Sequence, residues 1–301
     1  MKKLILILLC LTGFSFAADY QIPSQLVGSS PTSVSLGTNI FENEAIAVFE
    51  TDILAKNKVS VSAFNVKTMN DYNTTMAAIS MSFKDVILGV GVSTAGTDGI
   101  EITAEQGSDN EIISTGQTYK YINAHYKGSI TYYLSELVAV GGGISYYSSQ
   151  IYNTTGAGFN GSISTRFKFN ERTDVVLVIE NILSTTVQFD SSDEALPMQM
   201  VFASRYQFND QLFLVGSLRN TYSNTEYKSN QLFSFGGQYS LVKHLNISAS
   251  IFQEYAGINV KNNVAFGTCL MLDKLFFQYA YKVVDYEESS AQHFLAMSIN
   301  L

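Results

Sequence analysis

The sequence is poor in proline, in charge and in cysteine, and each shortage excludes a class of protein. Only 3 of 301 residues are proline and 15% are charged, whereas a soluble β-sandwich needs turn prolines and a more charged outer face. After the N-terminal leader no run of about eighteen apolar residues follows, which argues against a transmembrane helix. The net charge of −8 argues against nucleic acid as a partner. Tyrosine and phenylalanine, with 18 and 20 residues, are abundant instead.

The N-terminus has the three parts of a secretory signal peptide. Met1-Lys2-Lys3 is charged, Leu4 to Leu11 is apolar, and Ser15-Phe16-Ala17 is a small-x-small cleavage site. We expect cleavage after Ala17. Cys10 would leave with the leader, so Cys269 would then have no partner for an internal disulfide.

The pattern of the last eleven residues predicts a strand of an outer-membrane barrel. Their length suits a tilted strand that crosses a bilayer core, and a soluble chain rarely ends on an apolar ladder. The two faces alternate, except that Phe294 falls on the polar one. Leu295, Met297, Ile299 and Leu301 form the apolar face, opposite Gln292, Ala296, Ser298 and Asn300.

Similar alternation recurs along the chain and predicts an all-β fold. It is clearest at 159–169, where Phe159, Ile163 and Phe167 oppose Asn160 and Ser162. An even number of about fourteen strands suits a bacterial transmembrane antiparallel up-and-down β-barrel. We place them near 57–66, 72–83, 86–95, 118–134, 137–150, 155–169, 173–182, 198–208, 211–221, 227–240, 244–255, 259–271, 274–284 and 291–301.

Short and variable connections alternate between these strands. An up-and-down barrel with both termini in the periplasm predicts this pattern, whereas a Greek-key protein does not. The short ones are 84–85, 135–136, 170–172, 209–210, 241–243 and 272–273. The variable ones are 67–71, 96–117, 151–154, 183–197, 222–226, 256–258 and 285–290.

Aromatic residues cluster beside the expected turns, as the interface girdles of a barrel do. The alternative is the ordinary strand preference of tyrosine and phenylalanine. The candidate girdle residues are Tyr132, Tyr133, Tyr146, Tyr147, Phe167, Phe169, Tyr206 and Phe208.

No catalytic or metal-binding pattern is present in the sequence. His125, His244 and His293 are the only histidines, lie on different expected strands and belong to no catalytic motif. No spacing of cysteine, histidine and carboxylates suggests a metal site, and no cofactor is expected. The glycines of 89–91 and 141–143 lack the strand–turn–helix context of a phosphate loop, so they indicate close packing or a kink. We therefore do not expect an enzyme.

The order of several motifs resembles the FadL-like outer-membrane barrels, most closely their PorV/PorQ branch. They are Ser35-Leu36-Gly37, the alanine-rich run 45–55, the strand 59–62, the glycine-rich strands 86–92 and 138–144, the strand end 178–182 and Leu196-Pro197. One departure is Glu50-Thr51-Asp52, which stands where the family usually has Asn-Pro-Ala. The resemblance implies that the N-terminal segment folds into the barrel mouth.

Residues 39–55 predict a short amphipathic helix that would serve as this plug, with a periplasmic or surface segment as the alternative. Charged wall residues should point inward or lie at the rims, because charge facing lipid is unfavourable. They either contact a ligand or only balance one another around lumen water. The candidate ligand or lumen residues are Leu36, Ile40, Phe41, Phe49, Arg166, Glu180, Arg205, Arg219 and Lys282.

These observations predict a signal peptide at 1–17, an N-terminal segment or plug at 18–56 and a transmembrane barrel at 57–301 in the bacterial outer membrane. The resemblance implies passage of small hydrophobic or amphipathic compounds. The alternative is a PorV-like partner subunit of a protein secretion or surface-attachment system, and a structural envelope protein is a weaker third. The expected partners are outer-membrane lipid, the barrel-assembly machinery through the C-terminal strand, and either a small apolar ligand or a secreted protein.

Overall fold

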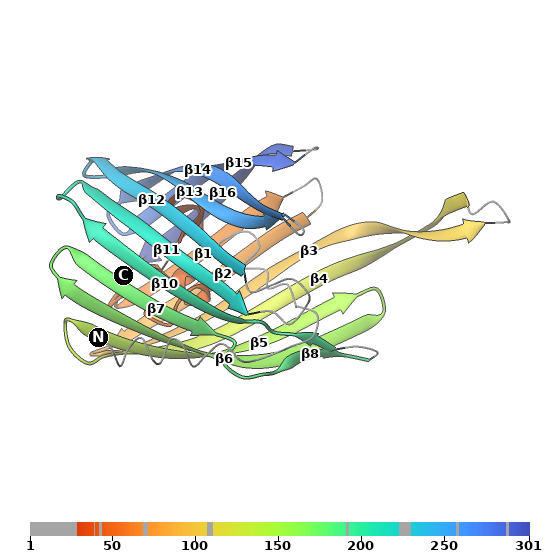
Figure 1. Ribbon diagram of the computed structural model, residues 1–301, viewed down its shortest axis with the longest axis horizontal. Coiled ribbons are helices and arrows are strands. Elements are labelled where there is room, and N and C mark those ends of the chain that lie inside the picture. The colour runs from red at the N-terminus through yellow and green to blue at the C-terminus, as the bar shows by residue number, and fades with distance from the viewer. Residues whose placement is uncertain are drawn as a thin grey trace.

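The chain forms a closed antiparallel β-barrel of fourteen strands over the residues that the structure describes (Figure 1). The structure is a computed structural model that describes residues 29–38, 40–41, 44–68, 72–106, 111–190, 193–222, 230–256, 259–286 and 289–301. The predicted signal peptide therefore lies outside the described residues. No helix in the described part of the chain is long and apolar enough to cross a membrane.

The wall strands follow one another around the barrel in chain order. They are Val59–Thr68 (β1), Tyr72–Phe83 (β2), Val86–Gln106 (β3), Glu111–Tyr133 (β4), Val138–Ile151 (β5), Thr154–Asn170 (β6), Thr173–Glu180 (β7), Met198–Gln207 (β10), Leu212–Tyr222 (β11), Asn230–Val242 (β12), Leu245–Ala256 (β13), Asn259–Leu272 (β14), Leu275–Tyr286 (β15) and Ser289–Asn300 (β16).

Pairing of β16 with β1 closes the barrel. The register runs from Ser60 opposite Asn300 to Val66 opposite Phe294. The barrel thus has no free wall edge, which a sheet in hydrocarbon requires. The predicted number of strands and the predicted partner of the last strand are both confirmed.

The alternation of the sequence separates the outside of the barrel from the inside. Leu295 and Met297 are exposed on the outside, whereas Phe294 is fully buried and stacks on Phe64 with ring centroids 6.2 Å apart. Phe294 thus breaks the pattern because it packs inward. On β6, Phe159 and Phe167 face out while Asn160 is buried, as predicted.

The expected aromatic girdle needs two corrections. Tyr132 and Tyr146 are exposed on the outside, but Tyr133 donates a hydrogen bond to the carbonyl of Leu54 inside the barrel, and Tyr147 is buried. Successive residues of a strand point to opposite faces, so only one member of each tyrosine pair can face lipid. The others, Phe167, Phe169, Tyr206 and Phe208, are exposed.

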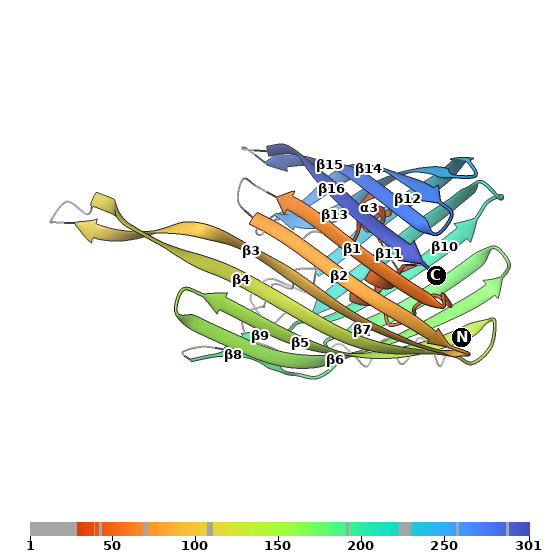
Figure 2. The ribbon, with the colours of Figure 1, turned by 180° about the vertical axis from the view of Figure 1, so that it is seen from behind.

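Two expected connections contain strands. Residues 96–106 and 111–117 extend β3 and β4 into a ribbon that projects well beyond the barrel, paired as far as Gln106 opposite Glu111 (Figure 2). The segment 183–197 holds the strands Thr186–Phe189 (β8) and Asp193–Ala195 (β9), which extend the sheet beside β6. Because the two strands of this ribbon pair with each other, their backbone groups form hydrogen bonds without any neighbouring wall strand.

Two short helices lie inside the barrel and, with the residues around them, form the plug. We define the plug as the described residues between 29 and 57. Its helices are Pro31–Leu36 (α3) and the 3₁₀ helix Ala45–Phe49 (η1). The predicted helix 39–55 is therefore too long, and α3 was not predicted.

Local sequence determines where α3 begins and ends. The hydroxyl of Ser30 accepts a hydrogen bond from the amide of Ser33 at 2.9 Å, and Pro31 occupies the first turn. Gly37 ends the helix in the left-handed region at φ 74°. Its Cβ would also lie 2.6 Å from the Cβ of Ser234, so glycine is required there by conformation and by space.

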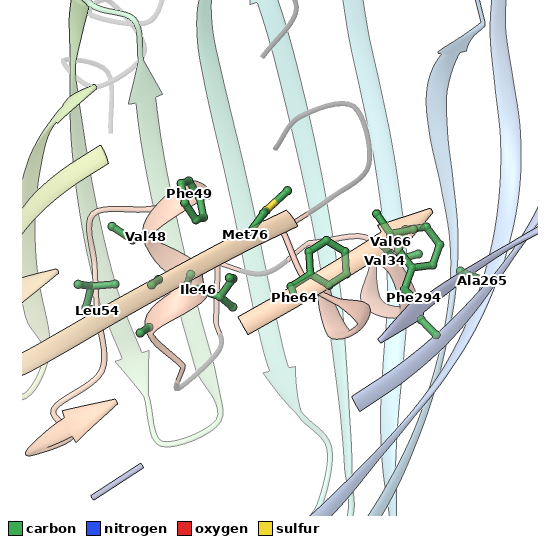
Figure 3. Close-up of a cluster of buried hydrophobic side chains, with 14 of the residues drawn as sticks. Val34, Ile46, Val48, Phe49, Leu54, Phe64, Val66, Met76, Ala265 and Phe294 are labelled. Atoms are coloured by element: carbon green, nitrogen blue, oxygen red, sulfur yellow. The ribbon is translucent and has the colours of Figure 1, made fainter. Parts of the chain in front are cut away.

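The hydrophobic core lies between the plug and one side of the wall. Val34, Ile46 and Phe49 of the plug belong to one buried apolar cluster with Phe64 and Phe294 of the wall (Figure 3). Burial of each large apolar side chain stabilises the fold by about 1.5–3 kcal/mol. The inside of the barrel therefore contains an apolar core as well as polar wall residues.

Candidate functional site

Glycines of the wall make room for the η1 side of the plug. A Cβ on Gly91 would lie 2.6 Å from the ring of Phe49, and one on Gly143 would lie 2.4 Å from the carboxylate of Asp52. Both distances are far below a normal carbon contact. The prediction that 89–91 and 141–143 mark close packing is therefore confirmed, and the plug is what they accommodate.

A buried ion cluster fixes the plug to strands β4, β6 and β7. Nζ of Lys127 lies 3.4 Å from Asp52 and 3.0 Å from Glu180, and the Lys127 side chain is 1% exposed. Ser162 and Ser164 each donate a hydrogen bond of 3.0 Å to Asp52. Two carboxylates around one ammonium, with added hydroxyl donors, are the kind of pairing that a buried charge requires.

Backbone hydrogen bonds hold the same segment in an extended conformation. The amide of Asp52 donates to the hydroxyl of Ser164 at 3.0 Å, and the amide of Leu54 donates to Thr131 at 2.9 Å. Thr131 in turn donates to the carbonyl of Asp52 at 2.5 Å. Because the wall takes these backbone groups, the segment after η1 does not continue as a helix.

Glu44 ties the start of η1 to the closing strands. Gln278 of β15 and Ser298 of β16 each donate a hydrogen bond to its carboxylate at 2.5 Å. Burial raises the pKa of Glu44 from its ordinary value near 4.5 to about 7, although the two hydrogen bonds lower it. This carboxyl is therefore poised to take up a proton near neutral pH.

The α3 side of the plug rests on small polar residues of β12, β13 and β14. Ser248 donates to the hydroxyl of Ser35 at 2.7 Å, and Ser250 donates to the carbonyl of Val34 at 3.0 Å. A Cβ on Gly236 would lie 2.5 Å from the carbonyl of Leu36, so the helix touches the wall backbone. No ion pair fixes α3 among the described residues.

A cavity of about 150 Å³ lies between this side of the plug and the wall. Its wall residues lie near the ends of strands that the turns 208–211, 243–244 and 273–274 connect, on the side of the barrel where the chain ends. We call it the turn-side cavity. It is lined by Thr32, Leu36, Thr38, Phe41, Glu44, Arg205, Phe213, Val215, Gln238, Asn246, Cys269, Met271, Phe276 and Gln278.

Two arginines share one carboxylate beside this cavity. Arg166 lies 3.0 Å from Oδ2 of Asp174, and Arg205 bonds the same oxygen. The guanidinium of Arg205 also lies 5.3 Å from the ring centre of Phe41, within cation–π range. Arg205 therefore links the wall to the plug, and its charge is already partly compensated.

The structure brings only some of the predicted site residues together. Leu36, Phe41 and Arg205 line the turn-side cavity. Arg166 lies beside them because it shares the carboxylate of Asp174 with Arg205. Phe49 and Ile40 do not line it. Phe49 packs 5.6 Å from the ring of His125, and Ile40 packs in a separate apolar cluster of β7 and β10.

The other predicted wall residues lie elsewhere. Glu180 belongs to the buried cluster with Lys127. Lys282 is buried on β15, and its ammonium lies 5.5 Å from the ring centre of Phe252 on β13. Arg219 is half-buried on β11, opposite Val201 and Leu232. None of these three lines the cavity.

Sequence reasoning missed the residues that hold the plug, namely Glu44, Asp52, Lys127 and Asp174. One signal was visible, because Asp52 stands where the resembled family has a different tripeptide. Lys127 also lies on the polar face of its strand, whereas Asp174 shares its face with the apolar Val176 and Val178. Their pairing could not be predicted, because Asp52 and Lys127 are 75 positions apart and meet only through the closed barrel.

Histidines and metal ligands form no centre in the structure. His125 is buried, stacks on Tyr147 with ring centroids 4.6 Å apart and bonds Ser145 at 3.0 Å. His293 lies on β16 beside Tyr279. Among the described residues, no group of three cysteines, histidines or carboxylates is placed to hold a metal ion.

Comparison with known proteins supports the fold class. The chain is similar to the Ralstonia pickettii toluene transporter TbuX, with a TM-score of 0.66 and 11% identity over 92% of this chain and 99% of that one. It is similar to the CymD monoaromatic hydrocarbon channel, with a TM-score of 0.67 and 12% identity over 92% and 98%. It is also similar to a Pseudomonas aeruginosa FadL homologue, with a TM-score of 0.62 and 10% identity over 95% and 99%.

These similarities show that the fold is like that of the FadL homologue and of the two hydrocarbon transport proteins. At 10–12% identity they concern the fold alone. No family model and no curated protein sequence matches the chain.

Proposed function

We propose that this chain lets small hydrophobic or amphipathic compounds cross the bacterial outer membrane. The observation that carries the proposal is a barrel whose inside is filled by a fixed plug, with a partly apolar cavity left beside it. A water-filled general pore would lack such a plug. Compounds of toluene size are the first class to test, because similar folds belong to toluene and monoaromatic hydrocarbon transporters.

The outer surface supports an outer-membrane location. Leu295, Met297 and Phe159 are examples of large apolar side chains that would be unfavourable in water and stable against lipid. The proposal also includes removal of residues 1–17, insertion through the barrel-assembly machinery by the C-terminal strand, and both chain ends in the periplasm. The boundaries between a plug segment at 18–56 and a barrel at 57–301 belong to it as well.

Uptake and conductance together test the proposal. Cells that lack their own hydrophobic-compound channels and express this chain should take up radiolabelled toluene faster than cells with an empty vector. The purified protein should show no steady conductance in planar bilayers, and deletion of 35–55 should create conductance and permeability to dyes. A large steady conductance of the intact chain without toluene uptake would overturn the proposal.

The closer resemblance to the PorV/PorQ branch implies the alternative of a partner subunit in secretion or surface attachment. Purification from native membranes separates the two functions. Transport predicts bound small apolar molecules, whereas the partner role predicts bound proteins in fixed ratio and no uptake.

A further inference from the structure

The walls of the turn-side cavity are apolar over most of their area but carry a few polar groups. Aromatic rings come from Phe41 of the plug and from Phe213 and Phe276 of the wall. An apolar cavity of about 150 Å³ in another protein holds one benzene molecule. A volume of about 150 Å³ therefore suits a ligand with one ring or a short alkyl chain.

Two buried acceptors on the cavity lining have no hydrogen-bond partner. Oδ1 of Asn246 and Oε1 of Gln278 are unpaired, and the two residues are 8% and 4% exposed. The amide nitrogen of Gln278 is already used by Glu44, so its free oxygen can only accept. The amide nitrogen of Asn246 has only a 4.0 Å contact with the sulfur of Met271. Unpaired buried acceptors favour a ligand that brings a donor.

The charged groups on the lining disfavour a charged ligand. Arg205 is bonded to Asp174, so a carboxylate ligand would have to compete with a buried carboxylate. Glu44 on the same lining would repel that carboxylate when it is ionised, and Arg205 would repel an ammonium. An uncharged hydroxyl or N–H group avoids both costs and can donate to one of the open acceptors.

We propose that the turn-side cavity binds an uncharged, single-ring-sized compound that donates a hydrogen bond to Asn246 or to Gln278. Phenol is its simplest representative. The inference rests on the proposed function and narrows its substrate class, because a pure hydrocarbon would leave both acceptors unpaired. The proposed site lies on the side of the plug that faces the tight turns, so a transported compound would bind there.

Protection of Cys269 from alkylation gives a local readout, because its sulfur-bearing side chain lines the cavity. The purified full chain in detergent is treated with N-ethylmaleimide in increasing phenol, anisole or toluene. Mass spectrometry then measures modification of the Cys269 peptide. Anisole keeps the ring and the oxygen but has no donor, so phenol should protect at a concentration at least about tenfold lower. Calorimetric titration of the same samples gives this ratio without depending on thiol reactivity.

Asn246→Leu should reduce the advantage of phenol, because it keeps the volume and removes one of the two acceptors. The matched control is Asn263→Leu, since Asn263 is also a buried amide with an unpaired atom but does not line the cavity. The control should keep the tenfold preference. Gln278→Met removes the second acceptor and serves if Asn246→Leu does not fold.

Equal binding of phenol, anisole and toluene would overturn the inference, as would no binding of any of them or a preference unchanged by both cavity variants. Failure of the proposed function is distinguishable. If cells take up toluene but the purified protein shows no preference for phenol, the proposed transport is supported and the donor-selective site is rejected. Phenol selectivity in the purified protein without uptake supports the site and rejects transport.

Discussion

The two sides of the plug are attached to the wall in different ways. On the η1 side, Asp52 enters a buried ion cluster, and Gly143 leaves no space between plug and wall. On the α3 side, hydroxyl contacts such as that of Ser35 with Ser248 carry no charge, and a cavity remains. The comparison indicates that one side of the plug is a fixed anchor and the other is where space for a ligand is kept.

The largest expected effect comes from breaking the anchor. Lys127→Met leaves Asp52 and Glu180 buried without their cation, so unfolding free energy should fall by about 3–5 kcal/mol. Denaturant unfolding in detergent measures this change. Lys120→Met is the control, because the pair of Lys120 with Asp98 is exposed and its loss should cost about 0–1 kcal/mol. Equal effects of the two variants would contradict a buried anchor.

Glu44 lies between the two sides and should make stability depend on pH. Its pKa is raised by burial from about 4.5 to about 7, so the native state binds a proton more tightly than the unfolded chain. The stabilisation is complete below pH 4.5 and is lost as the pH rises to about 7, a loss of up to roughly 3 kcal/mol. Unfolding at pH 5 and pH 8 measures it. Glu44→Gln should show a smaller fall with pH, and an unchanged fall would reject this role.

Glycine variants test whether the anchor side is as tightly packed as it looks. Gly143→Ala would place a Cβ 2.4 Å from Asp52 and should destabilise the protein by about 1–3 kcal/mol. A Cβ on Gly128 meets nothing within 4 Å, so Gly128→Ala should be neutral or stabilising by up to about 1 kcal/mol. Thermal unfolding of the two variants gives the comparison. A destabilised Gly128→Ala with an unaffected Gly143→Ala would reverse the assignment.

The smallest effect is expected on the cavity side. Asn246→Leu should change the unfolding free energy by less than about 1 kcal/mol, because the amide nitrogen has only a weak contact with the sulfur of Met271. Asn181→Leu makes the contrast, since its amide donates to the carbonyl of Pro197 at 2.9 Å and accepts from Tyr147 at 2.9 Å. That variant should cost about 1–3 kcal/mol. Similar losses in both would mean that the amide of Asn246 makes contacts that its substitution breaks.

The sequence predicted the wall far better than the plug. Period-two alternation places Phe159 outside and Asn160 inside without any knowledge of neighbours, because a pleated strand has only two faces. No comparable periodicity predicts the conformation of the plug. Its helix was predicted at 39–55, but the backbone of Asp52 and Leu54 bonds wall side chains instead. Contacts between residues so distant along the chain follow from closure, which no local pattern encodes.

The site was predicted in part for the same reason. Leu36 and Phe41 were expected as lumen residues, because apolar side chains in a short segment need cover, and they line the cavity. Arg205 was expected to point inward or lie at a rim, because lipid excludes charge, and it also lines the cavity. That these residues contact a ligand stays a prediction. The acceptors of Asn246 and Gln278 were not singled out, because a polar residue on an inner face shows its partner, or the lack of one, only in three dimensions.

Closure of β16 on β1 also links formation of the ring to placement of the plug. The amide of Leu301 donates to the carbonyl of Val59 at 2.7 Å, so closure joins the strand that follows the plug to a strand far from it along the chain. The plug comes before β1 in the chain, yet the finished ring surrounds it on all sides. Once β16 has joined β1, only the open ends of the barrel give the plug a way in. A plug left outside would have its apolar residues in water and would leave Lys127 without Asp52.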